Sequence, residues 1–289
     1  MHRLRRYARV LGIATMVLLT RCSGADLLNA TVDTNDVTIT RDIPYMPGPR
    51  GMMDIYRPTQ SAGPLPVVVF FYGGAWQTGK RQDYLFAATA LARRGMVVAV
   101  PDYRVYPEVQ FPVFLQDAAR AVATIHHAAA SYGGDPNRFV VVGHSAGGWI
   151  AAMLALDPQW LAAAGDSRDS LAGMVGLAGP YNFLPITGAD IQQVFASAPD
   201  KAVTQPISYA DGRNPPMLLL QGEADDTVGL QNATSLTARI KADGGPVTLR
   251  TYPGVGHIGI VISLTPLFRD KNTALDDMAQ FILALPAVP

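Results

Sequence analysis

The sequence predicts an α/β protein, in which a mostly parallel sheet is covered by helices on both faces. Continuous apolar runs rich in β-branched residues, such as 65–71, 97–100 and 139–142, are typical of strands buried on both sides. These runs alternate with segments of helical spacing that end at glycines. The 289 residues are 49% hydrophobic and 16% charged, which suits one domain with a sizeable core.

The first 25 residues predict an export signal. Four arginines precede an apolar run over 10–20, which is too short to span a bilayer comfortably and suits the apolar region of a signal peptide. Ser23 and Ala25 are small residues placed for a cut before Asp26. We therefore expect an exported protein, periplasmic or secreted. An uncleaved anchor and a misassigned start are the alternatives.

Cys22 gives the same segment a second interpretation. The stretch around Cys22 resembles a bacterial lipoprotein signal, in which this cysteine carries lipid and attaches the protein to a membrane. Arg21 departs from that pattern, because a small residue usually precedes the cysteine. Cys22 is the only cysteine, so the sequence predicts no disulfide and no cysteine-based metal site.

The elements of the body, 30–289, follow in order from residue pattern. Alternating polar and apolar residues over 36–45 and 51–58 predict an antiparallel strand pair with one solvent-facing side. Apolar runs predict later strands, and helical spacing predicts the segments between them. The strands are expected within 65–74, 96–104, 138–144, 171–182, 215–226 and 247–257, and the helices within 82–95, 111–134, 147–156, 230–245 and 273–286. The stretch 183–213 has no clear period and predicts irregular structure or short helices.

Charge composition excludes one class of partner. The 23 basic and 23 acidic residues give a formal net charge of zero, so no basic face for nucleic acid is predicted. We also expect no metal and no organic cofactor.

Ser145 lies where an apolar strand turns into a helix, within Gly-His-Ser-Ala-Gly over 143–147. A serine nucleophile on a sharp strand-to-helix turn needs small neighbours, and Gly143 and Gly147 supply the room. The helix start behind it directs free N–H groups toward developing negative charge. The alternative is a glycine-rich turn with an ordinary N-cap serine.

His257 is the candidate base, because serine is a poor nucleophile without one. It follows the last predicted strand in a glycine-rich loop, at the edge of the sheet where Ser145 is expected. His144 is the variable residue of the turn, and we expect its side chain to point away from Ser145. The other three histidines lie in the signal or within a predicted helix: His2, His126 and His127.

Asp225 is the candidate carboxylate that orients the base, since it lies in the acidic turn after the strand over 215–222. The neighbouring Asp226 could cap the next helix, and the same role is the structural alternative for Asp225. Ser145, Asp225 and His257 then occur in the chain order of α/β-hydrolases.

An oxyanion hole is expected from backbone N–H groups near Ser145. Gly73, Gly74 and Ala75 follow a buried strand, and their small size exposes the backbone. The N–H of Ala146 would be the partner donor. A simple Gly-Gly turn is the alternative for the first segment.

Taken together, five segments resemble α/β-hydrolase fold esterases in sequence and order: FFYGGAW, DYRVYPEVQFP, FVVVGHSAGG, QGEADDTV and GVGH. The resemblance covers about 35–289 and is closest to carboxylesterase-type members related to hormone-sensitive lipase, kynurenine formamidase and the feruloyl or acetyl-xylan esterases. It implies Ser145 as nucleophile, Asp225 as acid and His257 as base. It implies oxyanion donors at Gly74, Ala75 and Ala146.

The resemblance departs from the family at two places. Tyr72 stands where the family usually has histidine, so the backbone donors survive but the histidine that braces their loop does not. The family's large lid is also not evident, and 183–213 is expected to form a small cap at most.

The expected function is hydrolysis of a small-molecule carboxylic ester through a serine acyl-enzyme. An amide or formamide hydrolase of the kynurenine formamidase type would use the same residues. An exported binding lipoprotein that keeps the fold without turnover is the alternative from another class. The apolar residues near the site in chain order either shape the acyl pocket or belong to the core: Trp76, Tyr181, Phe183 and Ile258.

Overall fold

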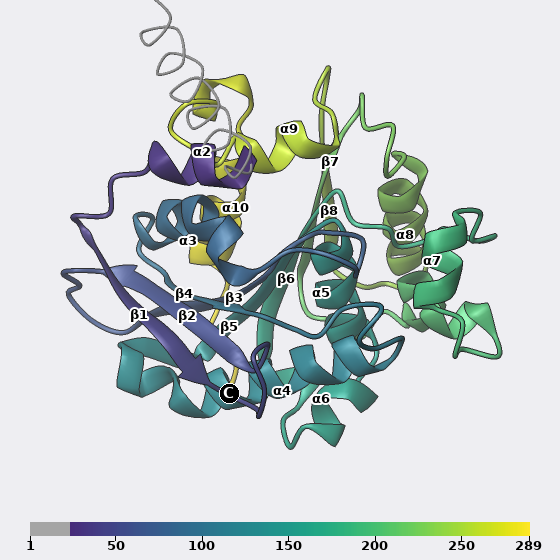
Figure 1. The fold of residues 1–289 in the computed structure, drawn as a ribbon, viewed down its shortest axis with the longest axis horizontal. Coiled ribbons are helices and arrows are strands. Elements are labelled where there is room, and N and C mark those ends of the chain that lie inside the picture. The colour runs from purple at the N-terminus through teal and green to yellow at the C-terminus, as the bar shows by residue number, and fades with distance from the viewer. Residues whose placement is uncertain (1–23) are drawn as a thin grey trace, which may run out of the picture.

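The computed structural model describes residues 24–289, and Figure 1 shows one sheet running through it. The strand order is β1-β2-β4-β3-β5-β6-β7-β8. β1 pairs antiparallel with β2, β2 pairs antiparallel with β4, and the other neighbours are parallel, which confirms the predicted mostly parallel sheet. The strands are β1 (Val37–Pro44), β2 (Met52–Pro58), β3 (Leu65–Phe71), β4 (Val97–Pro101), β5 (Gly134–His144), β6 (Leu171–Leu177), β7 (Met217–Gly222) and β8 (Val247–Tyr252).

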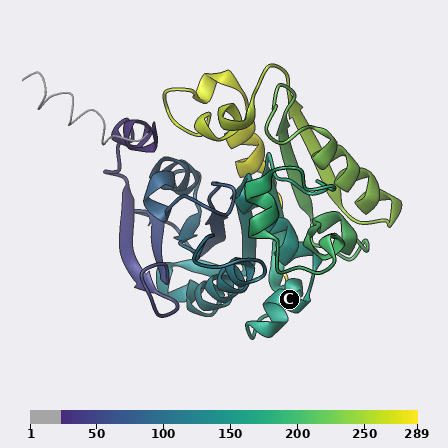
Figure 2. The ribbon, with the colours of Figure 1, turned by 45° about the vertical axis from the view of Figure 1, so that its right-hand side comes forward.

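Helices cover both faces of this sheet (Figures 1 and 2). α3 and α10 contact each other on one face, whereas α4 and α5 contact each other on the opposite face. A 3-10 turn over Pro206–Tyr209 contacts both α5 and α8, which places α8 on the α5 side. The helices are α2 (Gly24–Ala30), α3 (Leu85–Ala92), α4 (Val113–Ala128), α5 (Ala146–Leu156), α6 (Gln159–Ala163), α7 (Ala189–Val194), α8 (Gln231–Ala242), α9 (His257–Ile262) and α10 (Ala274–Ala284).

Two expectations about local structure need correction. The helix expected over 82–95 is divided into a 3-10 turn, Arg81–Tyr84, and α3. The loop expected around His257 is instead the first turn of α9, which follows an extended Gly256 and buries Ile260 and Val261. The stretch 183–213 contains α7 and two 3-10 turns, as short helices were predicted there.

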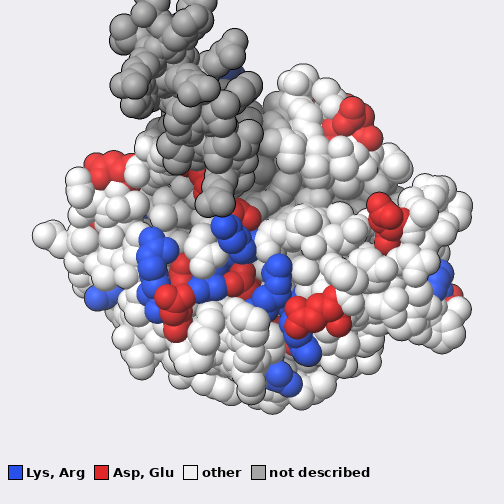
Figure 3. Space-filling view, in the orientation of Figure 1, with Lys and Arg blue, Asp and Glu red and all other residues white. Residues whose placement is uncertain are grey.

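The predicted export signal and the lipidation of Cys22 lie outside the described residues, apart from Gly24 and Ala25 at the start of α2. Both stay predictions. Within 24–289, no helix combines the length and apolar character that a membrane span needs. The same residues contain no cluster of three or more His, Cys, Asp or Glu that could hold a metal ion. On the face in Figure 3, charged side chains of both signs intermingle.

A buried ion cluster joins the strands β2 and β4 to the chain segment before α3. Arg81 is 6% exposed, and its Nε donates to Asp54 Oδ1 at 2.9 Å. Its guanidinium also pairs with Asp102, and its backbone N–H donates to Asp102 Oδ1 at 2.7 Å. Asp54 and Asp102 are 1% and 4% exposed, so Arg81 compensates two carboxylates that water does not reach.

Arg81→Met is expected to lower the free energy of unfolding by about 3–5 kcal/mol, because it leaves the buried Asp102 without its cation and Asp54 with only the more exposed Arg41. Urea denaturation followed by circular dichroism measures this change. Arg93→Met is the matched control, since Arg93 pairs with the exposed Asp36 and should contribute less than about 1 kcal/mol. Equal losses in the two variants would contradict a special role for the buried cluster.

Candidate active site

Ser145 occupies a strained corner between β5 and α5. Its backbone angles are φ 55° and ψ −121°, a region that side-chain-bearing residues rarely adopt. A Cβ on Gly143 would lie 2.1 Å from the carbonyl oxygen of Gly147, and one on Gly147 would lie 2.0 Å from that of Phe71. The corner therefore requires glycine at both positions. Ser145 makes no side-chain cap hydrogen bond to α5, which rules out the ordinary N-cap interpretation.

The structure brings Ser145, His257 and Asp225 together at the carboxyl edge of the sheet, where β5, β8 and β7 end. Ser145 Oγ lies 2.9 Å from His257 Nε2. His257 Nδ1 lies 2.9 Å from Asp225 Oδ2. With the proton on Nδ1 donated to the carboxylate, Nε2 is free to accept the serine proton.

Asp225 is held by three further donors. Its Oδ1 accepts from the N–H groups of Thr227 at 3.0 Å and Val228 at 2.8 Å, and its Oδ2 accepts from Gln221 Nε2 at 2.9 Å. The Asp225 side chain is fully buried. Asp226 is exposed and does not cap α8, since α8 follows Leu230 without a side-chain cap. The carboxylate beside the histidine is therefore that of Asp225.

Residues with free backbone N–H groups line the same cavities as Ser145. The N–H groups of Gly74, Ala75 and Ala146 donate no hydrogen bond to any residue within 24–289. The backbone at Gly74, Ala75 and Trp76 has φ values of 130°, 53° and 59°, so the oxyanion loop, which we define as residues 73–76, is strained. Three donors are thus available where a carbonyl oxygen would gain negative charge.

Gly73 must be removed from the predicted donor set. Its N–H donates to the hydroxyl of Tyr84 at 3.1 Å and is not available to a substrate. The glycine is needed for space instead, because a Cβ would lie 3.0 Å from His144 Nδ1 and 3.1 Å from Ser145 Cβ.

Tyr72, which stands where the family usually has histidine, is held firmly directly before the oxyanion loop. Its ring stacks on Tyr103 with centroids 4.5 Å apart, and its hydroxyl donates to Asp102 Oδ1 at 3.1 Å. The Tyr103 hydroxyl in turn donates to the carbonyl oxygen of Tyr72 at 2.8 Å. Burial raises the pKa of both phenols well above the usual value, so both keep their protons.

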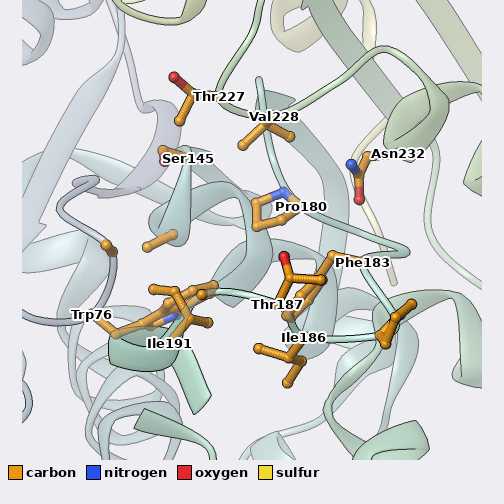
Figure 4. A pocket seen from close by; sticks show the side chains of 14 residues that line it. Trp76, Ser145, Pro180, Phe183, Ile186, Thr187, Ile191, Thr227, Val228 and Asn232 are labelled. Atoms are coloured by element: carbon orange, nitrogen blue, oxygen red, sulfur yellow. The ribbon is translucent and has the colours of Figure 1, made fainter. Parts of the chain in front are cut away.

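Two cavities meet at Ser145, and Ala75, Ser145 and Thr227 line both. The apolar cavity has a volume of about 260 Å³ (Figure 4). The second cavity, which we call the polar groove because Gln77, Thr78, Asp83 and His257 are among the residues that line it, has a volume of about 660 Å³. His257 does not line the apolar cavity. The apolar cavity is lined by Trp76, Phe183, Pro185, Ile186, Ile191 and Val228, and the polar groove by Gln77, Thr78, Asp83, Tyr84, His257 and Ile258.

Four apolar residues were expected to shape the acyl pocket or to belong to the core. Two of them, Trp76 and Phe183, line the apolar cavity. Ile258 belongs to the polar groove, and Tyr181 is 1% exposed within the core.

His144 is the residue that sequence reasoning missed. Its Nε2 lies 3.2 Å from the carbonyl oxygen of His257, and the two rings have centroids 5.0 Å apart. Burial, and secondarily the charge of His257, lowers the pKa of His144 to about 3. The sequence around His144 does not indicate this contact, because the partner residue lies 113 residues away along the chain.

Sequence comparison places the chain in a family. The BD-FAE profile matches residues 53–240, more than half of the sequence. The chain belongs to the BD-FAE family.

Curated relatives of this BD-FAE protein are named esterases. It is 28% identical over 267 residues to Isoprenylcysteine alpha-carbonyl methylesterase ICME of Arabidopsis thaliana, covering 85% of this chain and 62% of the relative. It is 30% identical over 241 residues to Esterase LipC of Mycobacterium tuberculosis (strain ATCC 25618 / H37Rv), covering 75% of this chain and 59% of the relative. The chain thus spans about three fifths of the length of these two relatives.

Solved structures match the BD-FAE chain at lower identity. A truncated carbohydrate esterase from gut microbiota has a TM-score of 0.72 at 19% identity, covering 85% of this chain and 95% of that one. Thermogutta terrifontis esterase 2 phosphonylated by sarin has a TM-score of 0.71 at 21% identity, covering 87% and 96%. With the observed sheet order, this likeness confirms the predicted α/β-hydrolase fold.

Proposed function

We propose that this BD-FAE protein hydrolyses carboxylic esters through a serine acyl-enzyme. The observation that carries the proposal is the continuous contact from Asp225 through His257 to Ser145, with both hydrogen-bond distances at 2.9 Å. Free N–H groups stand beside the serine, and the relatives described above are named esterases. These names favour ester substrates over the amide or formamide alternative and over a binding protein without turnover.

The geometry supports a two-stage mechanism. Ser145 Oγ bonds to the ester carbonyl carbon while His257 Nε2 takes the serine proton. The carbonyl oxygen becomes an oxyanion and accepts hydrogen bonds from the free backbone N–H groups of Ala146 and the oxyanion loop. His257 then gives its proton to the departing alcohol oxygen, and the carbon–oxygen bond breaks. Water releases the acyl group by the same base, while Asp225 stabilises the imidazolium throughout.

A fluorophosphonate probe and a pair of matched substrates test this function. We expect the folded protein to be labelled on Ser145 and to hydrolyse p-nitrophenyl acetate much faster than p-nitroacetanilide and N-formylanilines. Peptide mass spectrometry locates the label, and absorbance follows the reaction. Faster N-formyl hydrolysis would favour the formamide hydrolase. Folded protein that is neither labelled nor active would favour the binding lipoprotein.

The two cavities suggest how an ester would lie. His257 must reach the oxygen of the leaving alcohol to protonate it, so the alcohol belongs on the side that includes His257, which is the polar groove. The acyl group then occupies the apolar cavity, whose walls favour a short to medium hydrocarbon chain. Figure 4 shows Trp76, Ile186 and Ile191 together on one side of this cavity.

Ile191→Trp is expected to lower kcat/KM for p-nitrophenyl hexanoate about tenfold or more relative to the acetate, because each CH₂ kept out of an apolar site loses about 0.8 kcal/mol. Ile258→Trp, the matched control in the polar groove, should leave that ratio within about twofold. Kinetics with acetyl, butyryl and hexanoyl esters measure both. If instead Ile258→Trp changes the chain-length preference and Ile191→Trp does not, the two cavities are assigned the wrong way round.

A further inference from the structure

A chain of hydrogen bonds runs along the wall of the polar groove, from the oxyanion loop to the backbone of the base. The N–H of Gly73 donates to the Tyr84 hydroxyl at 3.1 Å. That hydroxyl lies 3.2 Å from His144 Nδ1. His144 Nε2 lies 3.2 Å from the carbonyl oxygen of His257. None of these contacts is used in the mechanism above.

The protons in this chain have one consistent arrangement. A carbonyl oxygen only accepts, so His144 Nε2 carries the hydrogen and donates it to His257. Because burial holds the pKa of His144 at about 3, the ring is neutral and Nδ1 is an acceptor. Burial raises the pKa of Tyr84 to about 12, so its hydroxyl keeps the proton and donates it to Nδ1. Every member then makes each bond that its chemistry allows, which is how buried polar groups are stabilised.

This chain of hydrogen bonds ends at the oxyanion loop and at the first turn of α9, the two segments whose positions matter most for the reaction. Gly73 directly precedes the donors Gly74 and Ala75, and the carbonyl at the other end belongs to His257 itself. His144 directly precedes Ser145, so the link between these two segments is anchored at the end of β5. Residues with positive φ, such as Ala75, persist only where the surroundings hold them.

We propose that Tyr84 and His144 are positioning residues that hold the oxyanion loop and the backbone of His257 in register with Ser145. The proposal rests on the ester hydrolysis proposed above. Neither residue takes part in bond making, so each acts by keeping donors and base where the transition state needs them. Interactions of this kind affect kcat more than KM, because the oxyanion forms only after the substrate has bound.

Tyr84→Phe removes the central hydroxyl and frees the Gly73 N–H. Complete loss of an oxyanion donor lowers kcat about 10²–10³-fold, so a displaced donor should lower it about tenfold, with KM changed less than about twofold. Tyr252→Phe is the matched control, since its buried hydroxyl, 2.7 Å from Asp277 Oδ2, faces α10 rather than the site. Its kcat should equal that of the wild type.

Two substitutions at His144 test its contact with Tyr84 and its contact with His257 separately. His144→Asn keeps an amide oxygen near Nδ1 to accept from Tyr84 but loses the donor to His257. His144→Gln places an amide N–H₂ near Nε2 to donate to His257 but leaves Tyr84 without its acceptor. We expect each to lower kcat about 5–20-fold with KM nearly unchanged, and His144→Ala, which loses both contacts, to be slower than either.

A double variant tests whether the residues act as one unit. The kcat of the double variant Tyr84→Phe, His144→Gln should be at least about half that of the slower single variant, since both changes interrupt the same link. If the kcat losses of the two single variants multiply in the double variant, the two residues act independently and the coupling is overturned.

Because Tyr84 also lines the polar groove, the variants are measured with methyl and p-nitrophenyl esters of one acid. A positioning role predicts the same fold-change for both alcohols, and a change confined to one alcohol would overturn it.

Failure of this proposal is distinguishable from failure of the proposed function. A wild-type protein without labelling or turnover overturns the function. A wild-type protein with turnover, together with Tyr84 and His144 variants of unchanged kcat, overturns the positioning role alone. Circular dichroism melting checks each variant, and the two His144 amides keep the test decisive should Tyr84→Phe unfold.

Discussion

Ser145→Ala is expected to lower kcat for p-nitrophenyl butyrate by about four to six orders of magnitude and to abolish fluorophosphonate labelling. The substitution removes the oxygen that lies 2.9 Å from His257 Nε2 and leaves no atom able to form the acyl-enzyme. The free N–H groups of the oxyanion loop remain, so the residual rate should still exceed that in buffer alone.

The variant should stay folded, because alanine keeps the Cβ of serine and can occupy the same strained backbone conformation. Ser170→Ala is the matched control: the Ser170 hydroxyl donates to Asp166, far along the chain from the triad, and its loss should leave labelling intact. Activity above about one hundredth of wild type in Ser145→Ala, or label on another serine, would show that the nucleophile lies elsewhere.

Asp225→Asn is expected to lower kcat by about 10⁴-fold while the structure is retained. The neutral amide cannot stabilise an imidazolium, and its N–H₂ faces His257 Nδ1, which favours the tautomer with the proton on Nε2. That tautomer cannot accept the proton of Ser145.

Asp226→Asn provides a matched comparison one residue away. Asp226 is exposed and makes its side-chain contact with Thr227, so activity should change less than about twofold. Steady-state kinetics on both variants, with urea denaturation of each, separate catalysis from folding. Similar losses in the two variants would contradict the assignment of Asp225 as the partner of His257.

Sequence analysis predicted those site residues whose place in the fold follows from the strand that they directly follow in the chain. Parallel strands end at one edge, so residues that directly follow β5, β7 and β8 must approach one another, whatever the details of packing. Gly143 and Gly147 were predictable for a related reason, since a corner this tight leaves no room for a Cβ on either.

The remaining parts of the site depend on contacts that chain order does not reveal. The N–H of Gly73 is engaged because a 3-10 turn brings the hydroxyl of Tyr84 beneath it, and sequence spacing does not indicate where that hydroxyl lies. The hydrogen bond of the Tyr72 hydroxyl depends on Asp102, which is 30 residues away and directly follows the neighbouring strand β4. Pattern analysis identifies elements and their ends, whereas side-chain direction between elements emerges only from the packed structure.

Residues 183–191 supply part of the wall of the apolar cavity, and the stretch 183–213 that contains them is joined to the body by hydrogen bonds. The N–H of Phe111 donates to the carbonyl of Val194 at 3.0 Å, and Trp149 Nε1 donates to the carbonyl of Thr204 at 2.8 Å. Ser145, His257 and Asp225 lie outside this stretch. Substitutions here can therefore change the shape of the cavity without touching the three side chains.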